Sequence, residues 1–230
     1  MLFRSNTDIT KLDLHDGKYI ATLNDGSTIS TDLVLFATGR NSDLSFLGDK
    51  IEIETDANGR VKVDSQLQTS ITNIYAIGDV ANNYHLTPVA IREAMIFARE
   101  QFEKETDKYV IENIPTAVFS NPEIGTVGLS EQDALQKYKK IDIYTSSFRP
   151  LYYTLSDVNK RTFIKLIIDH KTQVLVGFHM MGDDSAELTQ IMSTLINKKA
   201  SKMDLDNTIP LHPSTSEEIM TMRNKVTKEL

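Results

Sequence analysis

The segment from His212 to Glu218 has the residue types and spacing of a proton-transfer site. Ser214 and Glu217 stand three residues apart, the spacing of a capping box, which places Glu217 and Glu218 in the first turn of a helix. The imidazole of His212 would lie just before this helix, within reach of the Glu217 carboxylate. A carboxylate on one ring nitrogen fixes the tautomer and favours proton uptake at the other, as general acid–base work on a thiol requires. The alternative is that Glu217 only caps the helix and His212 is a surface residue.

A second candidate site lies at Gly78 and Asp79, which follow the apolar segment Ile74–Ile77. In an open α/β sheet, ligands bind outside the carboxyl ends of the strands. An aspartate at such a position can accept hydrogen bonds from ribose or ribityl hydroxyls, and the glycine lets a ligand come close. A strand that ends in an ordinary Gly-Asp turn explains the same residues equally well.

A helix is predicted to begin at Thr87 and Pro88, a good cap and first-turn pair, and to run to about Lys104. Its apolar positions recur with helical spacing at Val89, Ala90, Ala94, Phe97 and Ala98. The backbone N–H groups and the positive dipole end at Thr87 suit a carbonyl oxygen that gains negative charge, such as the one on the pyrimidine ring of a reduced flavin. A well-capped structural helix accounts for this segment without any ligand.

The elements that would position these residues begin with a hairpin over 18–40, turning at Asn24–Gly26. Its second strand ends in the uninterrupted apolar run Leu33–Ala37, a pattern typical of a strand buried on both faces. Gly39 at its end would let another group approach the backbone. We expect a short hairpin over 51–63 and a second buried strand at Ile74–Ile77.

The pattern changes after residue 113, where strands are followed by helices. This order is typical of an antiparallel sheet with helices on one side, an α+β unit, and it places a domain boundary near 106–114. The expected strands are 115–119, 140–148, 161–168 and 173–180, and the expected helices are 130–138 and 184–199.

Composition narrows the function classes. The 230 residues are 40% hydrophobic and carry a net charge of -7, which argues against a nucleic-acid-binding protein. No apolar stretch reaches membrane-spanning length, and the amino-terminal segment has no signal-peptide core, so we expect a cytoplasmic protein. There is no cysteine, which excludes a cysteine nucleophile or thiolate metal site in this chain, and its five histidines are scattered. We therefore expect no metal site.

Five segments together resemble the pyridine-nucleotide disulfide oxidoreductases, and within that family the glutathione reductases. They occur in the family's order and spacing across essentially the whole chain: FATGR at 36–40, YAIGDV at 75–80, LTPVAI at 86–91, IPTAVFSNPEIGTVGLSE at 114–131 and DNTIPLHPSTSEE at 206–218.

The resemblance implies roles for individual residues. Asp79, next to Gly78, matches the aspartate that binds the ribityl chain of FAD, and Thr87 matches the residue whose backbone meets the flavin ring. Gly39 matches a glycine near the bound pyridine nucleotide. His212 and Glu217 match the catalytic dyad, in which the histidine protonates the departing glutathione thiolate and the glutamate orients it. The family's His-Pro bond at this position is cis.

The resemblance also implies a domain order. It makes residues 1–40 the end of an NADPH-binding domain, 41–112 the second part of an FAD-binding domain and 113–230 a dimerisation domain that forms a homodimer. The fold would be an α/β remnant of the two nucleotide-binding domains followed by the α+β domain. The family's redox cysteines and glycine-rich nucleotide motifs are not in this sequence, so the chain matches the carboxy-terminal half of an enzyme that reduces glutathione disulfide. The alternatives are part of a dihydrolipoamide dehydrogenase or trypanothione reductase, or a non-catalytic dimerisation module.

Overall fold

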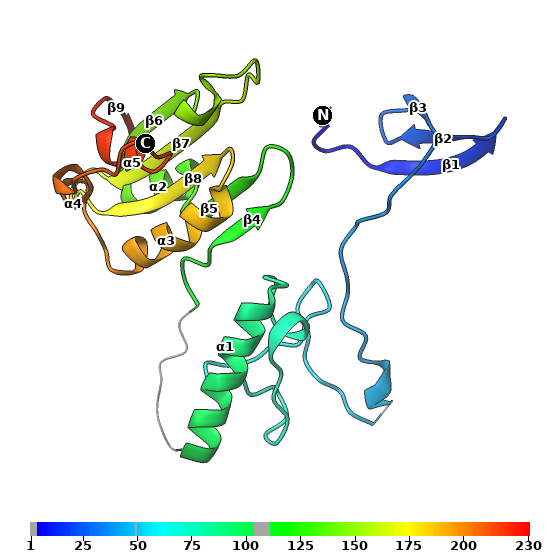
Figure 1. Ribbon diagram of the computed structural model, residues 1–230. Coiled ribbons are helices and arrows are strands. Elements are labelled where there is room, and N and C mark those ends of the chain that lie inside the picture. Colours follow the sequence, from blue (N-terminus) through cyan, green and yellow to red (C-terminus); the bar gives the residue numbers. More distant parts are fainter. Residues whose placement is uncertain (1–3, 49, 104–110) are drawn as a thin grey trace. The chain divides into compact units, whose positions relative to one another are not determined.

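The computed structural model describes residues 4–48, 50–103 and 111–230 (Figure 1). The chain divides into two compact units, Met1–Tyr109 and Val110–Leu230, and each is described by itself. The division falls within 106–114, where the sequence pattern changes. No helix in the described residues is long and apolar enough to cross a membrane.

The first unit contains a three-stranded antiparallel sheet of β1 (Ile9–His15), β2 (Lys18–Leu23) and β3 (Thr28–Thr31), in the order β1-β2-β3. The predicted hairpin is confirmed as β2 and β3. Its turn closes through a hydrogen bond from the Gly26 N–H to the Leu23 carbonyl, and Gly26 takes a positive φ of 82° that glycine adopts without strain. Strand β1 was not predicted.

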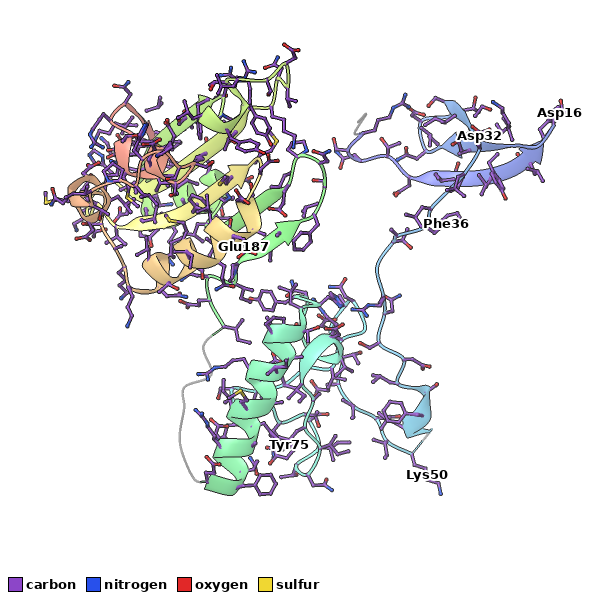
Figure 2. All side chains as sticks on the ribbon, viewed as in Figure 1. Asp16, Asp32, Phe36, Lys50, Tyr75 and Glu187 are labelled. Carbon is purple, nitrogen blue, oxygen red and sulfur yellow. The ribbon has the colours of Figure 1, made fainter. Side chains whose placement is uncertain are left out.

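Two predicted buried strands are absent from the described residues, and both predictions were wrong. Leu33–Ala37 is extended but belongs to no described strand, and Leu33 and Leu35 are 79% and 84% exposed. Figure 2 shows the side chain of Phe36 on this extended segment. In Ile74–Ile77 only Ala76 is buried, and Tyr75 makes a single bridge to Gln68. An apolar run becomes a buried strand only between flanking strands, and no described strand pairs with either run.

The rest of the first unit contains the helix α1 (Thr87–Ala98), which is confirmed and continues as a π-helical turn over Arg99–Glu103. Lys104, near which the predicted helix was to end, lies outside the described residues. The predicted hairpin over 51–63 reduces to a turn and one bridge between Thr55 and Val61. Two short 3-10 turns lie at Ser45–Leu47 and Gly78–Val80. Tyr75 lies beside α1, with its ring centroid 4.8 Å from that of Phe97 (Figure 2).

The second unit is built on a six-stranded antiparallel sheet in the order β4-β5-β8-β7-β6-β9 (Figure 1). Its strands are β4 (Thr116–Val118), β5 (Ile124–Gly128), β6 (Lys140–Phe148), β7 (Thr162–Asp169), β8 (Leu175–Met181) and β9 (Lys225–Glu229). The four predicted strands are confirmed as β4, β6, β7 and β8, whereas β5 and β9 were not predicted. The 3-10 turn Leu151–Tyr153 follows β6.

Helices cover both faces of this sheet, so the expectation of helices on one side was wrong. The helices are α2 (Glu131–Tyr138), α3 (Ser185–Asn197), α4 (Lys202–Asn207) and α5 (Glu217–Thr221). Ala134 of α2 packs with Ile141, Ile143 and Ile167, whereas α3, α4 and α5 contribute to a second core with Leu166 and Phe178. Because successive strand residues face opposite sides, Leu166 and Ile167 belong to different cores. The central strand β7 is consequently buried on both faces.

Candidate functional site

His212 and Glu217 lie together at the amino-terminal end of α5. The Nδ1 atom of His212 is 2.9 Å from Oε2 of Glu217. The imidazole is 73% exposed and the carboxylate 22% exposed, so the ring is accessible while its partner is partly enclosed. The His212–Pro213 peptide bond is cis, as the resemblance implied.

Only half of the predicted capping box forms. The Ser214 hydroxyl accepts a hydrogen bond from the Glu217 N–H at 3.2 Å and donates one to the Leu211 carbonyl at 2.7 Å. The Glu217 side chain hydrogen-bonds the His212 ring instead of turning back to Ser214. The two roles weighed for Glu217 are thus divided between its backbone, which takes part in the cap, and its carboxylate, which meets the imidazole.

The sheet holds the helix that carries Glu217. Ser146 on β6 donates a hydrogen bond to Oε2 of Glu218 at 3.1 Å. Ile219 and Met222 are buried in the larger core of the second unit. With Glu217 on Nδ1, the neutral ring keeps its proton there and presents Nε2 as an acceptor, whereas the imidazolium presents Nε2–H as a donor. The pair can therefore exchange a proton with a group that approaches Nε2.

The first unit places Asp79 on the wall of a cavity of about 190 Å³ that Arg40, Asn58, Arg60 and His85 also line. Nη2 of Arg40 is 2.5 Å from Oδ2 of Asp79, and Nδ1 of His85 is 3.6 Å from the same oxygen. Sequence reasoning did not single out Arg40 or His85. Arg40 directly follows Gly39, and this adjacency was the available signal.

The turn that carries Asp79 is fastened to α1. Glu93 of α1 is 1% exposed, accepts the Gly78 N–H at 2.5 Å and accepts the Asn82 side-chain amide at 2.9 Å. Gly78 has a φ of 71°, and a Cβ built there would stand 3.0 Å from that of Ala90. Glycine is therefore required where the turn meets the helix. Sequence reasoning missed Glu93, because a glutamate within a helix gives no signal that it is buried.

The residues present fit part of a flavin site. Asp79 offers a carboxylate on the wall of a cavity. The predicted cap at Thr87 was wrong: Leu86 is the N-cap residue of α1, and no described side chain caps the helix, so its first N–H groups are open to a ligand. Gly39 has a φ of 90° and open space where a Cβ would stand, which suits close approach by another group. Asp79, Gly78, Thr87 and Gly39 belong to the first unit and the His212–Glu217 pair to the second. In the described part of the chain, no three His, Asp or Glu side chains form a group that could hold a metal ion.

Comparison with known proteins identifies the family. Residues 2–94 match the model of the pyridine nucleotide-disulphide oxidoreductases, and residues 114–223 match that of the pyridine nucleotide-disulphide oxidoreductase dimerisation domain. The family is FAD- and NADPH-dependent. An HOCl-induced flavoprotein disulfide reductase from Escherichia coli shares the fold, with a TM-score of 0.82, 24% identity, and coverage of 94% of this chain and 50% of that chain.

Curated relatives point to the same family. The chain is 40% identical to a chloroplastic/mitochondrial glutathione reductase of Pisum sativum over 93% of this chain and 39% of that protein. It is 38% identical to a glutathione reductase of Burkholderia cepacia, over 96% of this chain and 50% of that protein. It is 35% identical to a trypanothione reductase of Trypanosoma congolense, over 95% of this chain and 45% of that protein. The chain thus spans half or less of the length of these relatives. It belongs to the pyridine nucleotide-disulphide oxidoreductase family, and within that family it is similar to glutathione reductases.

Proposed function

We propose that the chain serves as the carboxy-terminal half of an NADPH-dependent FAD flavoenzyme that reduces glutathione disulfide. The observation that carries this proposal is the 2.9 Å contact between His212 Nδ1 and Glu217 Oε2 at an exposed imidazole. A proton donor held in this way is what the departing thiolate of a cleaved disulfide requires. The identity to glutathione reductases supports the choice of substrate.

In this proposal FAD supplies the passage of reducing equivalents from NADPH to a cysteine pair. The pair must lie outside this chain, since the chain has no cysteine. When a cysteine thiolate attacks the disulfide, it forms a mixed disulfide with one glutathione, the original sulfur–sulfur bond breaks, and the other glutathione leaves as a thiolate. His212 in its imidazolium form gives the Nε2 proton to that sulfur, and Glu217 holds the ring through Nδ1 and stabilises its positive charge. Asp79 and the amino terminus of α1 would contact the flavin, with Gly78 and Gly39 leaving room for the cofactors.

We further propose that the active form is a homodimer through the second unit, where the family's dimerisation domain matches. Trypanothione disulfide is the alternative substrate, because a trypanothione reductase is 35% identical. A dihydrolipoamide substrate and a non-catalytic dimerisation module are the remaining alternatives. A cytoplasmic location stays a prediction, since one curated relative is chloroplastic/mitochondrial.

The test begins with the gene. We expect the DNA directly upstream to encode, in frame, a glycine-rich motif and paired cysteines. The polypeptide that includes them should bind FAD and oxidise NADPH when glutathione disulfide is added, and faster than with trypanothione disulfide or lipoamide. An upstream sequence without these motifs, or a flavoprotein that reduces no disulfide, would rule out the proposed enzyme and favour the dimerisation module.

A further inference from the structure

Helix α5 is too short to hold the His212–Glu217 pair in place without help. It has five residues, Glu217–Thr221, whereas isolated helices of fewer than about a dozen residues are marginal in water. Its amino-terminal end is fixed by the Ser214 hydroxyl and by the hydrogen bond from Ser146 to Glu218. The geometry of the pair therefore depends on what fixes the other end.

The carboxyl end of α5 is held by two cations. Lys202 of α4 is 4% exposed, and its Nζ donates a hydrogen bond to the Met222 carbonyl at 2.8 Å. The same Nζ forms an ion pair with Asp206 and lies 4.6 Å from the centre of the Tyr144 ring. Arg223 Nη1 lies 2.6 Å from Asp206 Oδ1 and donates to the Met220 carbonyl at 2.8 Å. The last carbonyls of a helix have no partner within it, so these donors satisfy them.

The strand β9 fixes the chain immediately beyond this end. Only Asn224 separates Arg223 from β9, which pairs with β6. Every residue of β9 is exposed, so apolar burial does not hold the strand. Instead, Lys225 Nζ and the Thr227 hydroxyl bind the fully buried Asp142 carboxylate on β6, at 2.8 Å and 2.7 Å. The match to the family's dimerisation domain ends at residue 223, so β9 lies beyond it.

We propose that Lys202 and strand β9 are positioning elements for the His212–Glu217 pair. They hold the carboxyl end of α5 so that the Glu217 carboxylate stays within hydrogen-bonding distance of His212 Nδ1. In a helix of little more than one turn, a shift at one end reaches the other end. The effect of this positioning on the reaction rate rests on the proposed function, whereas its effect on the contact between Glu217 and His212 does not. A displacement of about 1 Å in a catalytic group can lower the rate ~100-fold.

The geometric consequence can be measured on the 230-residue chain. Long-range proton–nitrogen NMR reports which ring nitrogen of neutral His212 carries the proton. We expect the Nδ1–H tautomer in the wild-type chain and its loss in Glu217→Ala, since Glu217 accepts from that nitrogen. Lys202→Met should shift the population toward that of Glu217→Ala. Lys198→Met, which removes the same charge from an exposed position, should leave it unchanged.

A second route covers the case in which Lys202→Met does not fold. Lys225→Met combined with Thr227→Val removes both hydrogen bonds from β9 to Asp142. Thr227→Val alone removes one of them and replaces the hydroxyl by a methyl group of similar size. Each should shift the tautomer in the same direction, Thr227→Val by less. A folded Lys202→Met with the wild-type tautomer would overturn the proposal, and so would the wild-type tautomer in the β9 double variant.

Turnover of the full-length flavoenzyme tests the catalytic consequence. Lys202→Met should lower the rate of disulfide reduction by ~10- to 100-fold while reduction of the flavin by NADPH stays unchanged. If His212→Ala retains full turnover, the proposed function is wrong, although the tautomer result keeps its meaning. If His212→Ala is inactive but Lys202→Met turns over normally, the function stands and the positioning role is wrong.

Discussion

At the scale of single residues, His212 illustrates how one contact distinguishes two interpretations of the same sequence. A surface histidine next to a capping glutamate would leave the carboxylate free to turn back toward Ser214. The structure instead turns the Glu217 carboxylate to His212 Nδ1 and leaves the cap to the Ser214 hydroxyl. This geometry supports the proposed role of the pair in proton transfer.

The first prediction concerns His212→Ala in the full-length flavoenzyme. Disulfide turnover should fall by ~100-fold or more, the usual effect of losing a positioned acid–base group. Reduction of the flavin by NADPH should be nearly unchanged, because the histidine acts on sulfur and not on hydride transfer. Stopped-flow reduction and steady-state turnover on one preparation measure both effects.

Glu217→Gln should show the same pattern more mildly. The amide oxygen still accepts from Nδ1–H, but a neutral side chain no longer stabilises the imidazolium. If Glu217 were only a cap, its replacement would cost about 1 kcal/mol of stability with normal turnover. Full activity in both variants would show that the pair has no catalytic role.

A third prediction concerns the pH dependence of Asp142. Burial alone would raise the pKa of this carboxyl, but hydrogen bonds from Lys225, Thr227, His170 and Gln173 outweigh burial and hold the pKa well below its ordinary value. Since the folded pKa is depressed, the stabilisation is present above the unfolded value of about 3.9 and is lost as the pH falls below it toward the folded pKa.

The variant Asp142→Asn should accordingly lower the free energy of unfolding at pH 7 by about 2 kcal/mol, the range for hydrogen bonds to a charged group. The difference from wild type should shrink below about pH 4. Urea unfolding of both chains between pH 3 and pH 7 measures it. A difference that stayed constant over this range would show that the charge on Asp142 contributes nothing.

At the scale of elements, the sequence predicted what periodicity alone determines. Strands β6, β7 and β8 and helices α1, α2 and α3 have long, regular patterns, and they are present. The apolar run Leu33–Ala37 was misinterpreted because a run of this kind shows that a segment can be buried, not that a partner strand covers it. Strand β9 was missed because its sequence, KVTKE, is short and polar. It pairs with β6 and binds Asp142 there, and both lie far away in the sequence.

In the candidate site too, contacts between neighbours in the sequence could be predicted and contacts between distant residues could not. The pairing of His212 with Glu217 could be predicted because both residues belong to one turn. The contacts of Arg40 with Asp79 and of Glu93 with Gly78 join residues distant in sequence, and Lys202 shows no sign in the sequence of being buried. These contacts are set by tertiary packing, which a local pattern does not record.

A fourth prediction concerns the packing of α3 on β5. A Cβ built on Gly125 would lie 2.1 Å from the Thr189 hydroxyl oxygen and 2.5 Å from the Ser185 carbonyl oxygen. Gly125→Ala should therefore push α3 away from the sheet and lower the free energy of unfolding by about 1–3 kcal/mol. Thr189→Ala in the same chain should recover only part of this loss, because the Ser185 carbonyl remains. An unchanged urea midpoint in Gly125→Ala would contradict the close packing.

At the scale of the whole molecule, the two units carry different parts of the proposed enzyme. The first contains the residues proposed to contact the cofactors, and the second the acid–base pair and the dimerisation domain. Neither contains a cysteine. We therefore expect the purified 230-residue chain to be colourless and unable to oxidise NADPH in the presence of glutathione disulfide. A yellow protein with NADPH-dependent turnover would contradict the proposed division of roles.

At the same scale, we expect the chain to form a homodimer through its second unit. Ile191 on α3 and Ile209 and Leu211 before the dyad are exposed in the single chain, and obligate dimer interfaces are large and apolar. Light scattering at tens of micromolar should give twice the monomer mass of 25.9 kDa. A folded, monodisperse monomer would exclude the dimer, and circular dichroism confirms that the sample is folded.

The exposed strand β9 has a further consequence for how the protein behaves in concentrated solution. A sheet edge presents unpaired N–H and C=O groups that can recruit a strand from another molecule, and charged side chains discourage this. Strand β9 closes the edge of β6, whose residues Ile141–Tyr144 are buried, and presents lysines and a glutamate in their place. A chain that ends at Arg223 would leave the backbone of β6 unpaired along Ile141–Tyr144 and should form β-rich aggregates at concentrations where the 230-residue chain stays clear.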